Sequence, residues 1–290
     1  MSLMFYLGLR WQNEMHTPKG NRWLILISFI VGLSFGIHFM GLLTIPAIGL
    51  LYFFENYKTI TIKNFIAANI IVTGVLLFVF KLLAPNILRY FSILEIFFVN
   101  TIGLPFNSGS VIALILLVYL IYLGLKYTKE KGYVNLNTGL MCLTFVIIGF
   151  TSWLMLPIRA NENVPVNENN PSSARELLAY YNLEQYPETK LFYGPQFTDF
   201  LSDEDKEEPY VDDKPKYEKD LKSGKYVIVN DYKDAKQNYN KDHASFLPRM
   251  WSPDHTENYL SYTNGLKYKI RDFKYFYDNY NDPEKTFESV

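Results

Sequence analysis

The 290-residue sequence has one cysteine, Cys142, and four histidines. A single cysteine excludes an intramolecular disulfide, and because Cys142 lies within an apolar run we interpret it as a packing residue. The histidines are not spaced as a ligand set, so the sequence predicts no metal site. A glycine-rich phosphate loop leading into a helix is also missing, which argues against nucleotide hydrolysis.

Acidic residues are scarce in the first half of the chain. Residues 1–158 contain ten Lys and Arg but four Asp and Glu, a net charge of +6, whereas residues 159–290 have a net charge of −7. Such an asymmetry marks a boundary. We expect residues 1–158 to form an all-α membrane bundle and residues 159–290 to form a small soluble α+β region. The acidity of the second region argues against nucleic acid as a partner.

Long apolar runs point to a lipid bilayer as one partner. The clearest run extends from Thr138 to Pro157, and about 20 apolar residues rising about 1.5 Å each cross a hydrocarbon core of about 30 Å. A buried core helix of a soluble protein is the alternative, but several comparable runs precede this one. Further spans are predicted at about residues 24–40, 42–54, 65–83 and 110–125, with a turn near Gly41 and an amphipathic interfacial helix at about 87–104.

The orientation follows from the basic residues, because short loops rich in Lys and Arg stay in the cytoplasm. The connections at residues 10–22, 55–64 and 126–132 share one side and hold eight of the ten basic residues of the first half. We therefore expect that side to be cytoplasmic and residues 159–290 to be extracytoplasmic. The first residues lack the charged start and cleavage site of a signal peptide, so the chain is interpreted as a fragment of a longer protein.

Three local patterns are visible in the soluble half. Ser173 followed by Glu176 is typical of a capping box, which predicts a helix from about Ser173 to Asn182. Residues 216–220 and 225–230 flank a turn and predict a β-hairpin. A short strand is expected at residues 190–193.

Four stretches occur in a characteristic order and spacing: GLSFGIHFMGLLTIPAIG (32–49), LPIRANENVPVNENNP (156–171), LFYGPQF (191–197) and FLPRMW (246–251). They resemble a bacterial family of multi-pass membrane proteins, common in Bacteroidota, that is classed as glycosyltransferase family 117. That family is similar to animal transmembrane protein O-mannosyltransferases. The resemblance implies a partial GT-C type fold in the bacterial inner membrane. It also implies a polyprenyl-phosphate-linked sugar as donor and a protein or glycan acceptor at the outer face.

The same resemblance leaves the catalytic residue unassigned. Enzymes of this class place an acidic catalytic residue in the first outer loop, near the N-terminus, and the region that would hold it is missing from this sequence. The alternative is a protein without enzymatic activity, such as a transporter subunit or an envelope scaffold.

Ionisable residues near the outer face are the candidates for substrate binding, because charge at membrane depth is costly. The forked donors of Arg159 match phosphate oxygens, so Arg159 could hold a carrier phosphate; the alternative is an interfacial anchor. His38 could instead make a hydrogen bond between helices. Arg89 and Glu95 could form an ion pair or act as independent surface groups.

The Asn-rich segment after the last span supplies further candidates. Asn161, Glu168 and Asn169 offer donors and acceptors that suit sugar hydroxyls. The alternative is a turn-rich linker in which Asn residues adopt turn conformations.

Overall fold

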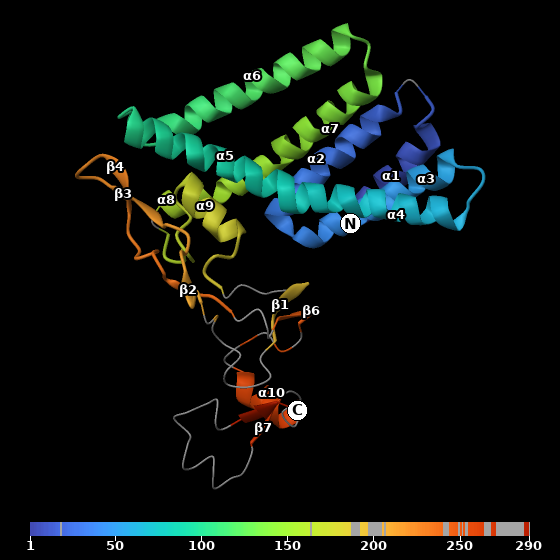
Figure 1. Ribbon diagram of the computed structural model, residues 1–290. Coiled ribbons are helices and arrows are strands. Elements are labelled where there is room, and N and C mark those ends of the chain that lie inside the picture. Colours follow the sequence, from blue (N-terminus) through green and yellow to red (C-terminus); the bar gives the residue numbers. More distant parts are fainter. Residues whose placement is uncertain are drawn as a thin grey trace. The chain divides into compact units, whose positions relative to one another are not determined.

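The computed structural model describes residues 1–290 except 18, 163, 187–191, 197–204, 206, 240–243, 249, 251, 253–254, 264–267, 271–286 and 290. The described chain forms two compact units. The first contains Met1–Gln185 and Lys219–Tyr226, and the second contains Tyr186–Glu218 and Val227–Val290 (Figure 1).

The first unit is predominantly helical (Figure 1). In chain order its helical segments are α1 (Ser2–Glu14), α2 (Asn21–Ile37), the 3-10 helix η1 (Phe39–Leu43), α3 (Thr44–Asn56), α4 (Ile62–Leu77), the π-helical segment η2 (Phe78–Leu83), α5 (Ala84–Ile96), the π-helical segment η3 (Phe97–Thr101), α6 (Ser108–Glu130), α7 (Val134–Phe150), the 3-10 helix η4 (Thr151–Leu154), α8 (Met155–Asn161) and α9 (Ala174–Tyr181).

Within the described residues, four continuous helical segments are long and apolar enough to cross a membrane. They are Phe39–Asn56, Ile62–Asn100, Ser108–Glu130 and Val134–Asn161, and α2 is a shorter apolar helix. Many apolar side chains of these segments are exposed, as expected where lipid is the solvent. The structure is therefore compatible with the predicted membrane helical bundle.

The breaks between helices differ from the sequence pattern at two places. The turn expected near Gly41 begins earlier, because α2 ends at Ile37 and His38 has an extended backbone (φ −166°). Near the N-terminus, α1 continues to Glu14, where a loop was expected from Arg10 onward. Glu14 stabilises this extra turn by pairing with Arg10 one helical turn earlier, at 3.2 Å.

The last apolar segment is also longer than expected. Helix α7 begins at Val134, and η4 and α8 extend the helical path to Asn161. Arg159 therefore lies in a helix, where the sequence pattern places the start of a loop. The side chain of Asn161 donates to the carbonyl oxygen of Pro157 (2.7 Å), which helps to end the helix before Glu162.

Residues 62–101 form one helical path, where the pattern predicts two helices separated near residue 85. Pro85 lacks a backbone N–H, yet the helix continues through it because the preceding segment η2 changes to π-helical hydrogen bonding. In this π register each N–H donates to the carbonyl five residues back, as Ala84 does to Val79. Residue 85 would therefore donate to the carbonyl of Phe80, and Pro85, which has no N–H, leaves that oxygen without a backbone donor. The hydroxyl of Tyr181, on α9, donates to that oxygen at 2.5 Å.

The length of this helix limits how it can sit in a bilayer. Its 39 residues from Ile62 to Asn100 would extend about 58 Å at about 1.5 Å per residue, roughly twice the hydrocarbon thickness. Only part of it can therefore cross the hydrocarbon core at a steep angle. The α5 part packs against α6 and also against α9.

Helices α2 and α7 make the closest helix–helix contact of the first unit. A Cβ atom added to Gly32 would lie 2.2 Å from the carbonyl oxygen of Val146, and one added to Gly149 would lie 2.2 Å from that of Phe29. The two helices run parallel, because Asn21 contacts Thr138 near their starts and Gly36 faces Ser152 near their ends. In the predicted topology both helices start on the cytoplasmic side, so that topology also requires them to run parallel.

The remaining elements include short strands. Strands β3 (Tyr217–Asp220) and β4 (Lys225–Ile228) form the predicted hairpin, and its tip, Lys219–Tyr226, belongs to the first unit. In the second unit β1 (Tyr193–Pro195) pairs antiparallel with β6 (Ala244–Phe246), β2 (Tyr210–Val211) with β5 (Lys236–Gln237), and β7 (Tyr268–Ile270) with β8 (Phe287–Ser289); α10 spans Thr256–Thr263. The strand expected at 190–193 overlaps β1 only at Tyr193, and residues 190–191 lie outside the described residues.

We expect Gly149→Ala to destabilise the bundle by about 1–3 kcal/mol, because the new methyl group would force α2 and α7 apart. Gly139→Ala on the same helix is the matched control, since a Cβ there meets nothing within 4 Å and alanine favours helix. Thermal unfolding of both variants in mild detergent measures the difference. Equal melting temperatures would show that the close contact does not hold the bundle.

Candidate functional site

His38 lies at the end of α2, beside an aromatic cluster. Its side chain is exposed, and its Nδ1 accepts from the backbone N–H of Met40 (3.1 Å), which leaves Nε2 as the free edge of the ring. The cluster comprises Phe35, Phe39, Phe80, Phe150, Trp153, Tyr180 and Tyr181. Trp153 Nε1 donates to the Phe35 carbonyl (2.6 Å) and so ties η4 to α2 near His38.

Arg159 lies on the last turn of α8 and its side chain is exposed. A cation is favoured at this end of a helix by the helix dipole. No hydrogen bond or ion pair of the Arg159 side chain occurs among the described residues. Its guanidinium donors are therefore available to a ligand or to water.

The Asn-rich segment folds back on α8 through its own amides. Asn161 Nδ2 donates to the carbonyl oxygen of Ser172 (3.0 Å), and Asn167 Nδ2 donates to Ala160 O (3.3 Å) and to Asn170 Oδ1 (2.8 Å). Asn169 adopts a left-handed conformation (φ 59°), which Asn tolerates better than most residues. These contacts show Asn161 in the structural role of a turn former, whereas Glu168 and Asn169 keep exposed side chains.

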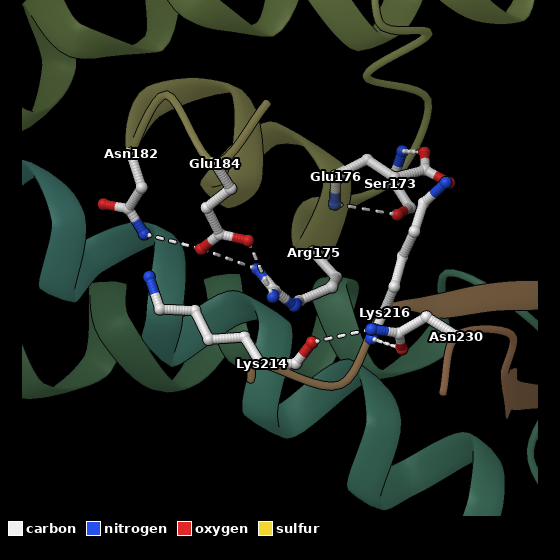
Figure 2. Close-up of polar contacts among 8 residues, drawn as sticks. All are labelled: Ser173, Arg175, Glu176, Asn182, Glu184, Lys214, Lys216 and Asn230. Atoms are coloured by element: carbon white, nitrogen blue, oxygen red, sulfur yellow. Dashed lines mark hydrogen bonds and ion pairs between the residues drawn. The ribbon is translucent and has the colours of Figure 1, made fainter. Parts of the chain in front are cut away.

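Figure 2 shows how the next helix, α9, begins and ends. Ser173 accepts from the N–H of Glu176, and the Glu176 carboxylate accepts from the N–H of Ser173 (2.8 Å), which is the predicted capping box. The guanidinium of Arg175, in the first turn of α9, donates to both carboxylate oxygens of Glu184, which follows the end of the helix, and the C-cap residue Asn182 donates to the same group (3.1 Å). Hydrogen bonds therefore fix both ends of this helix, and the helix packs on α5.

Arg89 and Glu95 are six residues apart on α5 and have different environments. Arg89 is exposed, whereas Glu95 has 2% of its surface exposed. The Glu95 carboxylate accepts four hydrogen bonds, so it is fully occupied within the protein. Its donors are Asn107 N–H (2.6 Å), Ser110 N–H (2.7 Å), the Ser110 hydroxyl (3.0 Å) and the Tyr226 hydroxyl (3.1 Å).

The Glu95 carboxylate caps the start of α6, because its donors Asn107 and Ser110 lie at the first turn of that helix. A negative charge at a helix N-terminus is favoured by the dipole and by the free N–H groups. Burial of such a charge is tolerated where every oxygen is hydrogen-bonded. The Glu95 side chain is therefore the link between α5, α6 and the hairpin tip.

Tyr226 anchors the hairpin tip to the helices. The Asn100 side chain donates to the Tyr226 carbonyl and accepts from the Tyr226 N–H, both at 2.8 Å, as a neighbouring strand would. The Tyr226 ring packs edge-on against Phe106, with centroids 5.2 Å apart. Burial, together with the nearby carboxylate of Glu95, raises the pKa of the Tyr226 phenol, so its hydroxyl stays protonated and donates.

The structure thus groups the predicted site residues by segment. Arg159, Asn161, Glu168 and Asn169 belong to α8 and the turn that follows it, and His38 lies beside the aromatic cluster that includes Trp153 of η4. Arg89 and Glu95 are on α5, and Glu95 is engaged by Tyr226, a residue that the sequence reasoning did not select. The signal for this contact was Asn100, a polar residue within an apolar run.

Among the described residues no group of three or more His, Cys, Asp or Glu could hold a metal.

The four apolar helical segments among the described residues are consistent with a multi-pass membrane protein. Residues 1–61, which include α1, α2, η1 and α3, match the family model of the Protein O-mannosyl-transferase TMEM260 N-terminal domain. These residues are therefore similar to the N-terminal domain of a protein O-mannosyl-transferase. Residues 187–285 match a family of unknown function (DUF8416). No curated protein and no solved structure matches the chain.

We expect Asn100→Ala to release the hairpin tip, because it removes both hydrogen bonds to the Tyr226 backbone. The amide of Tyr226 should then exchange with deuterium about tenfold faster, which corresponds to about 1.4 kcal/mol. Asn86→Ala is the matched control, since the one side-chain hydrogen bond of Asn86 among the described residues goes to Leu82 in the same helical path. Unchanged exchange at Tyr226 in Asn100→Ala would contradict the anchoring role.

Proposed function

We propose that this chain is part of an integral-membrane glycosyltransferase of GT-C type. It transfers a sugar from a polyprenyl-phosphate-linked donor to a protein or glycan acceptor at the outer face of a bacterial inner membrane. The observation that carries this proposal is the match of residues 1–61 to an O-mannosyl-transferase domain within a multi-pass helical chain. The catalytic acid or base is not assigned to a residue of this chain.

Arg159 is proposed to hold the carrier phosphate. Its side chain is exposed at the end of the helical path that leaves the last apolar segment, and its forked donors match two phosphate oxygens at once. His38 could donate to the same phosphate from Nε2, because its Nδ1 is already an acceptor. Arg89, exposed on α5, is the other cation proposed for the donor.

The turn after α8 is proposed to contact the sugar. Glu168 and Asn169 present exposed oxygen and amide groups there, and the hydrogen bonds of Asn161 and Asn167 hold the turn in place. Asn161 thus supports the sugar contacts indirectly, through the Ser172 carbonyl. Glu95 has the corresponding role for α5 and α6, because its oxygens are all occupied.

The test is sugar transfer by the protein as its gene encodes it, in membranes supplied with polyprenyl-phosphate-linked mannose. We expect Arg159→Lys to lower transfer at least tenfold, about 1.4 kcal/mol, because lysine keeps the charge and loses the two-pronged contact. The amount of protein in the membrane should not change.

Arg22→Lys is the matched control. Arg22 is an exposed arginine at the opposite end of α2, so its replacement should leave transfer unchanged. Full transfer by both Arg159→Lys and Arg159→Gln would reduce Arg159 to an interfacial anchor. Absence of transfer by the unmodified protein with any lipid-linked sugar would favour a transporter subunit or an envelope scaffold.

The proposed orientation has a separate test. In a Cys142→Ala background, Val166→Cys should react with a membrane-impermeant thiol reagent in intact spheroplasts, and Lys129→Cys should react only after lysis. Both side chains are exposed, and they lie beyond opposite ends of the last apolar segment. Reaction of residue 129 but not 166 in intact spheroplasts would reverse the orientation.

A further inference from the structure

The tip of the β3–β4 hairpin carries an apolar side chain that nothing in the described structure covers. Leu221 is 84% exposed and occupies the first position of the turn between the two strands. A single exposed leucine is ordinary on a protein surface. Leu221 differs from an ordinary surface leucine because lysines lie beside it and because the hairpin tip is anchored to α5 and α6.

The tip is basic within an acidic half of the chain. Residues 219–226 contain Lys219, Lys222 and Lys225 but one acid, Asp220, whereas residues 159–290 have a net charge of −7. Asp220 serves the turn itself: its carboxylate accepts from the N–H groups of Lys222 (3.0 Å) and Ser223 (3.3 Å). Hydrogen bonds from Ser223 and from the turn amides lower the pKa of the Asp220 carboxyl.

The lysines are directed to solvent. Lys222 and Lys225 are exposed, and no ion pair to either of them occurs in the part of the chain that the structure describes. Two exposed ammonium groups beside an exposed leucine are the composition of a surface that binds anionic lipid headgroups and inserts a side chain among them.

Tyr226 holds the hairpin tip at the depth where α6 enters its apolar stretch. The Tyr226 hydroxyl and the Ser110 N–H donate to the same carboxylate, that of Glu95. Val111, the next residue of α6, is 56% exposed and begins the apolar face that continues with Leu114 and Ile115. Tyr226 therefore lies close to the water–lipid boundary, and the five residue-to-residue steps from Leu221 to Tyr226 span at most about 17 Å.

We propose that the hairpin tip docks on the membrane surface next to the start of α6, with Leu221 among the lipid headgroups and Lys222 and Lys225 bound to phosphates of anionic lipids. The Asn100 and Glu95 contacts hold the tip at the height that this docking requires. The proposal depends on the membrane embedding of the helices and not on sugar transfer.

The test places a fluorescent label on the tip of the whole chain in lipid nanodiscs. Leu221→Cys in a Cys142→Ala background is labelled, and quenching by lipids brominated near the headgroup is compared between phosphatidylcholine and mixtures with phosphatidylglycerol. Val166→Cys is the matched control, because Val166 is also 84% exposed but has no lysine beside it in the sequence. In the mixture we expect at least about threefold more quenching at 221 than at 166.

Charge reversal and salt then test the lysines. Lys222→Glu with Lys225→Glu should lower quenching at 221 to the level in phosphatidylcholine alone. A salt concentration of 0.5 M should do the same for the chain that keeps both lysines, because the screening length is about 10 Å at 0.1 M salt and becomes shorter as salt rises. The salt titration needs no substitution at the lysines and so does not depend on the folding of the charge-reversed chain. Equal quenching at 221 and 166 overturns the docking. Quenching at 221 that is insensitive to lipid charge and to salt overturns the binding of phosphates.

Discussion

The close approach of α2 and α7 is the constraint on which the membrane part of this structure depends. Lipid chains are as apolar as the side chains they replace, so helices in a bilayer associate through packing rather than through the hydrophobic effect. Gly32 and Gly149 allow the two backbones to touch, and the aromatic cluster at the end of this contact joins α2 to η4 and α9. The positions of His38 and of the path leading to Arg159 both follow from this pairing.

Glu95 is a second constraint, because its carboxylate is buried away from water. A buried carboxylate is costly unless its oxygens are hydrogen-bonded, and here four donors come from the start of α6 and from Tyr226. The same group therefore caps one helix and fastens a hairpin far away in the sequence. In contrast, the side chains of Arg159 and Arg89 remain exposed.

The sequence predicted the features that depend on neighbouring residues. Apolar runs indicated the membrane segments, Ser173 and Glu176 indicated the start of α9, and the turn at residues 221–224 indicated the hairpin. Features that depend on distant residues were not predictable in this way. The contact between Asn100 and Tyr226 joins residues 126 positions apart, and the pattern alone could not show that Pro85 leaves its helix continuous.

The hydroxyl of Tyr181 has a consequence for the order of biosynthesis. It donates to Phe80, the carbonyl left without a donor by Pro85, and the two residues are 101 positions apart. When residues 62–101 leave the ribosome, the group that completes their hydrogen bonding has not been made. The long helix therefore reaches its final form only after α9 has been synthesised and has packed against α5, so that a segment made much later completes the hydrogen bonding of a helix made earlier.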